Sequence, residues 1–282
     1  QKNSRGKMVD REVGIRVWSD ANDDQKKQPD EVRHYRLDLG GWVAGWYLPM
    51  TKDMTFYGTN YRIAPTGWTA CGAPIYDVGR ATPLPQPDDS SGRHGGGMGT
   101  TRGLGSVDGR IMVYNSQYGR AHGDFPCYEI ATGRLLWSYP SNYVGVHGGH
   151  DAPPPKVGMI RAAYDFVGTG RLPEPIGDVF LIGTDKGEWH ILTGEGYYLG
   201  SLFEGDPMKI KWPENPAPGA IMNSVPPGSG AEDFGGSMIV TDEGELHVQA
   251  GKTVYFNCRV VGLDSVKALP GGKLKVSEDE LK

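Results

Sequence analysis

Oxygen-bearing side chains recur at alternate positions in the segment SDANDDQKKQPDEV, residues 19–32. Counted from Asp20, the positions that matter are 1, 3, 5, 7, 9 and 12, and they hold Asp20, Asn22, Asp24, Lys26, Gln28 and Glu31. This is the ligand spacing of an EF-hand calcium loop, in which position 7 contributes a backbone carbonyl and a distal Glu binds bidentately. The segment therefore predicts a calcium site, to which Lys26 contributes only its carbonyl oxygen.

Two positions of this loop depart from the usual pattern. Gln25 stands at position 6, where Gly normally makes the sharp turn, and Lys27 stands at position 8 in place of an apolar residue. A solvated acidic turn between two strands is the alternative interpretation. If calcium binds, we expect a structural ion that orders the loop by neutralising its clustered ligands. Imperfect ligands make a weak site, which fills only where calcium is near millimolar, so the loop favours an extracytoplasmic location.

A second group of potential ligands lies in GVHGGHDAPPP, residues 145–155. His147, His150 and Asp151 could supply imidazole and carboxylate groups to a metal ion or to a catalytic site. His94 and His122 also lie in glycine-rich surroundings. The alternative is that these histidines only hydrogen-bond to loop backbone. An enzyme would need the histidine loops to converge on one pocket, whereas their scatter would favour a binding module.

Composition and charge exclude several classes of protein. The 282 residues include 43 Gly and 21 Pro, with 10% aromatic residues, a combination typical of short strands and tight turns rather than of disorder. A net charge of -5 gives no electrostatic surface for nucleic acid. The sequence contains no apolar run of the roughly 20 residues that a membrane-spanning helix needs. It also lacks the GxSxG, HExxH and protein-kinase motifs.

The cysteines leave the redox compartment open. Cys71, Cys127 and Cys258 are widely spaced and form neither a CxxC metal pair nor a CxxCH haem-attachment motif. One disulfide with a free thiol and three separate thiols are both compatible with this spacing.

Strand-like runs bounded by Gly, Asp, Asn and Pro recur along the chain, at residues 13–18, 32–37, 53–58, 110–115, 178–184 and 237–242. Residues 108–138, 178–206 and 236–269 share a pattern of strand, turn, strand, glycine-containing turn and strand. Repeated units of several short strands are typical of propeller blades. The sequence therefore predicts an all-β fold, a β-propeller with about five blades visible, as part of a ring of roughly six to eight blades.

The expected domain boundaries follow from this repeat. Residues 1–270 form the propeller portion, and residues 271–282 begin a linker or a further domain. The linker-like opening QKNSRGKMVD predicts an internal piece of a longer protein whose N-terminal blades are missing. Sequence outside this piece, or another chain, would then complete the propeller.

The segment ATGRLLWSYP, residues 131–140, resembles the tail of the repeat of pyrroloquinoline-quinone-like propellers, in which a TG turn leads into a strand ending in Trp. The order of motifs along the chain, from VWSDANDDQKKQPDEV through ATGRLLWSYP to EDFGGSMIVTDEG, resembles large secreted proteins of planctomycete-type bacteria, whose activity is undefined. The resemblance implies a periplasmic or secreted location. It also implies neighbouring carbohydrate-binding modules, which makes polysaccharide an expected partner.

Two classes of function follow. The preferred hypothesis is a binding or scaffolding module of a larger secreted, carbohydrate-related protein. The alternative is a propeller enzyme with a histidine-rich axial site, either polysaccharide-cleaving or a metal- or quinone-dependent oxidoreductase. A scaffold subunit of a redox complex is a further alternative, because the chain has no haem motif of its own.

Overall fold

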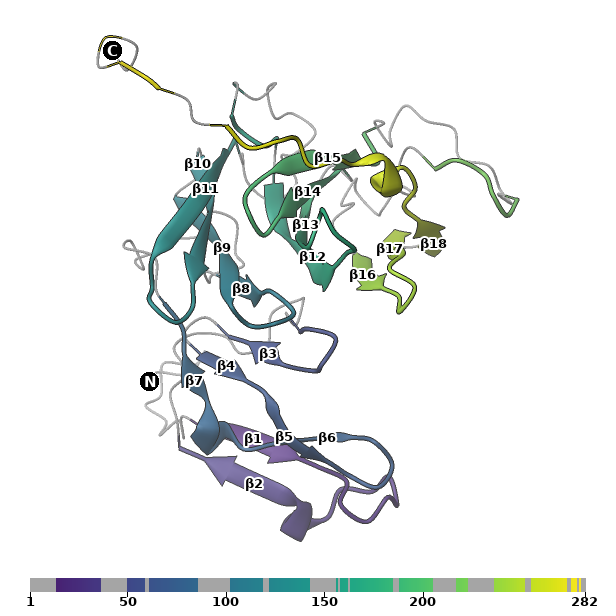
Figure 1. The fold of residues 1–282 in the computed structure, drawn as a ribbon. Coiled ribbons are helices and arrows are strands. Elements are labelled where there is room, and N and C mark those ends of the chain that lie inside the picture. The colour runs from purple at the N-terminus through teal and green to yellow at the C-terminus, as the bar shows by residue number, and fades with distance from the viewer. Residues whose placement is uncertain are drawn as a thin grey trace, which may run out of the picture.

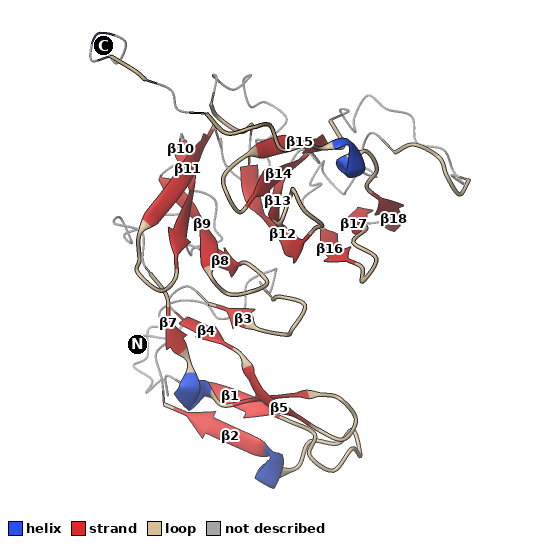
Figure 2. Cartoon of the chain, viewed as in Figure 1, coloured by secondary structure: helices blue, strands red, loops and turns tan. Residues whose placement is uncertain are grey.

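The regular secondary structure of the described residues is almost entirely β-strand, with three short 3-10 helices among the connections (Figures 1 and 2). The computed structural model describes residues 14–36, 50–58, 61–85, 102–118, 122–142, 156, 158–161, 163–184, 188–204, 217–222, 236–251, 255–272, 275–277 and 279. The 3-10 helices are η1 (Pro29–Glu31), η2 (Val78–Arg80) and η5 (Leu263–Ser265). In these parts of the chain, no helix is long and apolar enough to cross a membrane.

Three antiparallel sheets repeat one after another along the chain, and we call them blades I, II and III. Blade I consists of β8 (Arg102–Gly105), β9 (Ile111–Tyr118), β10 (His122–Glu129) and β11 (Leu135–Ser141). Blade II consists of β12 (Ala163–Arg171), β13 (Asp178–Thr184), β14 (Trp189–Thr193) and β15 (Tyr198–Leu202). Blade III consists of β16 (Gly236–Val240), β17 (Leu246–Gly251) and β18 (Tyr255–Arg259). Each strand pairs with the next, so that each blade is a simple meander.

The first strand of each blade lies toward a common centre. Strand β12 contacts both β8 and β16, and the later strands lead outward from there (Figure 1). Meandering sheets around a shared centre are the architecture of a β-propeller. The predicted fold class is therefore confirmed, and the strands described within residues 108–138, 178–206 and 236–269 belong to blades I, II and III respectively.

The N-terminal part of the described chain forms smaller sheets. Strands β1 (Ile15–Trp18) and β2 (Val32–Tyr35) form a hairpin, as do β5 (Pro65–Trp68) and β6 (Pro74–Tyr76). A three-stranded sheet contains β3 (Phe56–Tyr57), β4 (Tyr61–Ile63) and β7 (Thr82–Pro83). Strand β3 contacts β8, so this sheet adjoins blade I. The strands predicted at 13–18, 32–37 and 53–58 are present but shorter than expected.

The hydrophobic core lies between the blades. Phe125 of blade I meets Phe166 of blade II edge to face, with ring centroids 5.9 Å apart. Between blades II and III, the fully buried Trp189 belongs to a cluster that also contains Leu246 and Val248. Strands β13 and β14 are buried along their whole length, because other elements cover both faces of blade II.

Two glycines let the inner strands of blades II and III approach closely. A Cβ atom on Gly168 would overlap the side chain of Met238, and one on Gly170 would overlap Val240. Both glycines belong to β12 and both opposing side chains belong to β16. Absence of a side chain on β12 is therefore what leaves room for the apolar side chains of β16.

The TG–Trp motif makes the outer contact between blades I and II. The indole Nε1 of Trp137 donates to the carbonyl of Gly194 at 3.0 Å, and the hydroxyl of Tyr139 donates to the carbonyl of Gly196 at 2.8 Å. A Cβ atom on Gly196 would lie 2.7 Å from Cγ of Trp137. The tryptophan that ends the repeat in blade I is therefore packed on the β14–β15 turn of blade II.

No disulfide links the cysteines. Cys71 is exposed, Cys127 is buried in blade I and Cys258 is half-buried in blade III, and all three are free thiols. Burial raises the pKa of Cys127 to about 12, which keeps this thiol protonated and unreactive.

Substitution of Gly196 tests the contact with Trp137. Gly196 and Gly262 have similar left-handed φ angles of +88° and +92°, but nothing lies within 4 Å of a Cβ on Gly262. Both Gly→Ala changes carry the same backbone cost of about 1–2 kcal/mol. We expect Gly196→Ala to lower the free energy of unfolding by a further 1–3 kcal/mol or so, through overpacking against the indole. Urea denaturation measures the difference, and equal losses in the two variants would contradict the contact.

Candidate functional site

The predicted calcium loop connects β1 to β2 and is closed by its own backbone. The N–H of Ser19 donates to the carbonyl of Glu31 at 3.3 Å, just beyond the last pair of the hairpin, Trp18 and Val32. Asp20 and Glu31 are only 8% and 9% exposed although both are acidic. Burial of two acids in one small loop requires hydrogen bonds or a cation to compensate them.

Carboxylates organise the turn through backbone hydrogen bonds. The two oxygens of Asp20 accept from the N–H groups of Asp24 at 3.2 Å and Gln25 at 2.9 Å. Asp24 accepts from the N–H of Lys26 at 2.8 Å and from the amide of Gln28 at 2.6 Å. Gln25 has φ +60° and so adopts the left-handed conformation that Gly normally supplies at position 6. The loop therefore makes the sharp turn of a calcium loop without the glycine.

Glu31 is held at the closing position by three donors. Oε2 accepts from the indole of Trp18 at 2.9 Å and from the N–H of Gln28 at 3.3 Å, and Oε1 accepts from the N–H of Ala21 at 2.8 Å. The indole hydrogen bond is the main cause that lowers the pKa of Glu31, and the backbone donors add to it. Glu31 is therefore ionised at neutral pH, as a metal ligand must be.

The residues of the loop fit a hard cation. The side-chain oxygen Oε1 of Gln28 is buried and has no hydrogen-bond partner in the described structure, and Gln28 holds position 9. Calcium prefers carboxylate, amide and carbonyl oxygens, and each carboxylate oxygen keeps acceptor capacity beyond one hydrogen bond. Asp20, Asn22, Asp24, Gln28, Glu31 and the carbonyl of Lys26 would hold the ion. The hydrogen bonds around Glu31 also show how the loop can stay closed without one.

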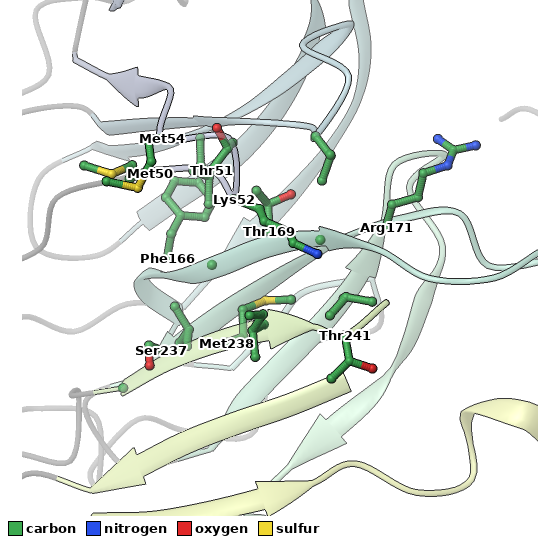
Figure 3. A pocket seen from close by; sticks show the side chains of 18 residues that line it. Met50, Thr51, Lys52, Met54, Phe166, Thr169, Arg171, Ser237, Met238 and Thr241 are labelled. Atoms are coloured by element: carbon green, nitrogen blue, oxygen red, sulfur yellow. The ribbon is translucent and has the colours of Figure 1, made fainter. Parts of the chain in front are cut away.

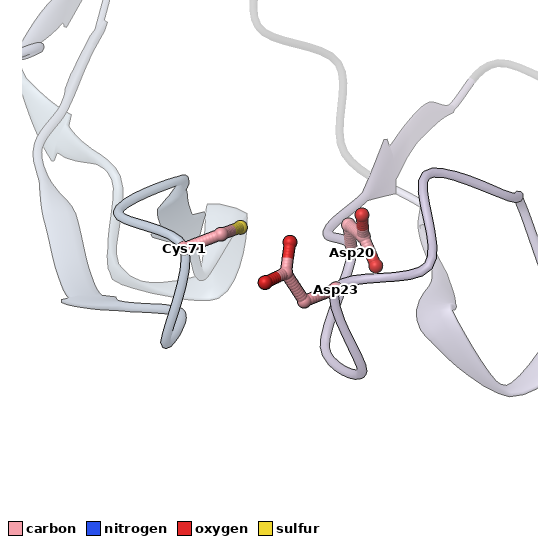
Figure 4. A group of neighbouring side chains, drawn as sticks. All are labelled: Asp20, Asp23 and Cys71. Atoms are coloured by element: carbon pink, nitrogen blue, oxygen red, sulfur yellow. The ribbon is translucent and has the colours of Figure 1, made fainter.

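A further group of potential ligands lies beside this loop. Side-chain ligand atoms of Asp20, Asp23 and Cys71 lie within 4.8 Å of one another (Figure 4). Cys71 comes from the turn between β5 and β6, where it also lies 3.0 Å from Oγ1 of Thr69. Sequence spacing gave no sign of this approach, because the two hairpins meet only in the folded chain. A thiol is a soft ligand, so this group differs chemically from the oxygen set expected for calcium.

A large cavity lies near the centre of the described structure, beside the inner strands β12 and β16 of blades II and III (Figure 3). Its volume is about 610 Å³, and its other side is lined by Met50, Thr51, Lys52 and Met54. The larger apolar side chains around it are Met50, Met54, Phe166 and Met238. Two cationic side chains also line it, and both are paired: Lys52 with Asp242 at 2.7 Å, and Arg171 with Asp178 at 3.3 Å.

The described lining of the central cavity offers no acid, histidine or cysteine that could transfer a proton or attack a substrate. Among the residues described around the cavity there is no Asp, Glu, His or Cys. The candidate residues His147, His150 and Asp151, together with His94, lie outside the described residues, and His122 begins β10. The structure therefore does not test whether the histidine loops converge.

A second, polar cavity of about 350 Å³ contains two carboxylates, Asp53 and Asp108. Burial opposes ionisation of each, but hydrogen bonds outweigh it and lower both pKa values: Thr51 and Thr55 donate to Asp53, and Ser106 and the N–H of Arg110 donate to Asp108. Among the described carboxyl groups with a shifted pKa, only Asp178 has a raised one, caused by burial and by nearby Asp108. Asp178 lines neither cavity. Glycoside hydrolysis needs a carboxyl group kept protonated beside the substrate, and neither cavity supplies one.

Comparison with known proteins assigns no family. No family model and no curated protein matches the chain. Similar solved structures include the mitotic checkpoint complex, at 13% identity and TM-score 0.37, covering 79% of this chain and 51% of that one. A protein of unknown function from Bacteroides caccae has 14% identity and TM-score 0.36, with 83% and 61% covered. Hsv2 from Kluyveromyces lactis has 12% identity and TM-score 0.30, with 88% and 79% covered. The chain thus spans about half the length of the first of these (51%).

Removing the charge of Glu31 tests its closing role. We expect Glu31→Gln to lower the melting temperature at pH 7, because an uncharged amide is a weaker acceptor for the three donors. Since folding lowers the pKa of Glu31, its contribution is present above the unfolded pKa of roughly 4.3 and is lost as the pH falls through the folded value.

The difference between wild type and Glu31→Gln should therefore shrink in acid. Asp30→Asn is the matched control, because Asp30 is exposed and is the neighbouring acid. Thermal melts between pH 7 and pH 3 make the comparison. The closing role is wrong if both variants melt like the wild type at pH 7.

Proposed function

We propose that the chain is a binding or scaffolding module of an extracytoplasmic, carbohydrate-related protein, with calcium as a structural ion in the 20–31 loop. The observation that carries this proposal is the central cavity, which has apolar walls and no described acid, histidine or cysteine. Concave, mostly apolar sites with a few fixed polar groups are typical of ligand binding. β-Propellers in general present such sites on a rigid ring of blades.

The carboxylates support binding over catalysis. Asp53 and Asp108 hold turns together and have lowered pKa values, so they serve as hydrogen-bond acceptors and not as acids. The two cations of the central cavity are likewise occupied by Asp242 and Asp178. A rigid surface whose charges are already paired suits recognition of an uncharged ligand.

Calcium would act on stability and not on chemistry. The loop joins β1 to β2, and its ligands come from one continuous segment of the chain. Binding of a cation would add to the hydrogen bonds that hold Asp20 and Glu31. A weak site of this kind fills where calcium is near millimolar, which supports the proposed location outside the cytoplasm.

Calcium titration tests the structural ion. We expect calcium to raise the melting temperature of chelator-treated protein, with a gain of about 1.4 kcal/mol when free calcium is ten times its Kd. Asp20→Asn and Glu31→Gln should remove this gain, whereas Asp30→Asn should keep it, because Asp30 is not a ligand position. Calorimetry that detects no heat of calcium binding, with unchanged melting curves, would leave the loop as an acidic turn.

Polysaccharide binding without cleavage tests the proposed role. In native gels that contain soluble xyloglucan, mixed-linkage glucan or galactomannan, we expect at least one polymer to retard the protein. The same mixtures should show no increase in reducing ends after prolonged incubation. New reducing ends would favour the enzyme alternative, and no retardation by any polymer would remove the carbohydrate part of the proposal.

A further inference from the structure

The two faces of blade III differ in chemistry. One face carries Met238, Val240, Leu246, Val248, Ala250 and Cys258, which pack against blade II. Burial alternates strictly along β16 and β18, so every second residue belongs to the opposite face. That opposite face is open to solvent and presents Ser237, Ile239, Glu245, His247, Gln249, Tyr255, Asn257 and Arg259. We call these eight residues the blade III platform.

The strand register arranges the platform in rows. Ser237, Gln249 and Asn257 are direct neighbours across the three strands, and so are Ile239, His247 and Arg259. Tyr255 stands at one end, opposite Gly251, and is 54% exposed. The result is a tyrosine ring at one end of β18 followed by a row of amide and hydroxyl groups.

The charges of the platform are fixed by one another. Arg259 Nη1 donates to Oε1 of Glu245 at 2.9 Å, and Nε2 of His247 lies 3.0 Å from Oε2 of the same carboxylate. These contacts from His247 and Arg259 lower the pKa of Glu245. Glu245 and Arg259 therefore carry opposite charges that cancel, and the pair has no net charge. The pairing holds long side chains flat across the sheet and leaves further donors of Arg259 free for a ligand.

This chemistry argues against a further blade or a second copy as the occupant. The buried strands β13 and β14 of blade II are mostly apolar, with Asp178, Thr184, His190 and Thr193 as their polar residues. The platform has only two apolar side chains, Ile239 and Tyr255, on different rows and strands. A protein partner of that kind requires a contiguous apolar patch. Balanced charge likewise gives no attraction for an anionic polymer.

The geometry points to the blade III platform as a binding surface for a neutral, extended polysaccharide chain. Uncharged hydroxyl groups need paired donors and acceptors, which Asn, Gln, Glu and Arg supply from planar groups. The apolar face of a sugar ring needs an exposed aromatic side chain, which Tyr255 supplies. This inference rests on the proposed binding role and adds to it a ligand class and a location.

The dimensions favour a chain over a single sugar. Residues 255 to 259 on β18 span roughly 13 Å, and the three strands are together about 10 Å wide. The described residues of the platform enclose no pocket for a monosaccharide. Ser237 and Ile239 also line the central cavity, so a bound chain would reach its mouth. We therefore expect hexasaccharides to bind and monosaccharides not to bind.

The test uses the whole chain with cellohexaose, xylohexaose and mannohexaose, compared with glucose, xylose and mannose by calorimetry. For the hexasaccharide that the wild type binds, we expect Tyr255→Ala to weaken binding by about tenfold or more. The double variant Gln249→Ala/Asn257→Ala should weaken it similarly. Tyr197→Ala is the matched control, because Tyr197 is 66% exposed on the β14–β15 turn of blade II. Melting temperatures of all variants should stay within a few degrees of wild type, because these side chains are on the surface.

The outcomes separate this inference from the proposed function. If a polysaccharide retards the protein but the platform variants bind hexasaccharides as the wild type does, the platform is wrong and the binding role stands. Failure of every hexasaccharide and every polymer to bind would overturn both the platform and the carbohydrate role. Sedimentation velocity gives a further test. If the protein is a dimer and Ile239→Glu dissociates it, the platform inference is overturned, because this face would then be an interface between two copies.

Discussion

The arrangement of the blades depends on the closeness of β12 and β16. Gly168 and Gly170 leave space that Met238 and Val240 fill, so two inner strands that are not hydrogen-bonded to each other still pack in contact. This packing buries one face of blade III in the cluster around Trp189 and Leu246. Because the side chains of a strand alternate, burial of one face necessarily turns the other toward solvent. The polar platform is a consequence of this contact.

A second contact fixes the blades farther from the centre. Trp137 reaches from β11 of blade I to the carbonyl of Gly194 and packs on Gly196 in blade II. Packing between inner strands alone would leave the angle between neighbouring sheets free to vary. Between blades I and II, whose inner strands β8 and β12 are in contact, the hydrogen bond of Trp137 near the rim restricts that angle, since the two points lie at different distances from the centre. Rigid blades are what a flat binding surface requires, because ordering the surface then costs little on binding.

Local patterns predicted local structure well and distant contacts poorly. Alternation along residues 236–259 predicted the strands of blade III, and the TG–Trp motif predicted a strand at Trp137, although β11 continues to Ser141. Nothing in the motif identifies the partner of Trp137, which lies 57 residues away. The oxygen-rich loop was visible because its donors and acceptors lie within twelve positions, whereas the approach of Cys71 was not. Residues 50–85 form strands of two to four residues held by tertiary contacts, too short for periodicity to reveal. The central cavity joins segments as distant as Lys52 and Thr241.

Four acids of the described chain fix tight turns as acceptors of backbone hydrogen bonds. Asp20, Asp53 and Asp108 each accept hydrogen bonds from nearby backbone N–H groups inside a tight turn, and Glu31 does the same at the end of its loop. Such bonds stabilise the ionised form, which is why the pKa values of Asp53, Asp108 and Glu31 are lowered. A carboxylate held in this way is a poor proton donor but a good fixed point for a turn. On blade III the turn between β16 and β17 is held instead by the hydroxyl of Thr241, which accepts from the N–H of Glu245. The strand register there places tyrosine, amide and guanidinium groups on one open face. Acids therefore fix turns in the N-terminal sheets and in blade I, whereas strand pairing and a threonine turn fix blade III.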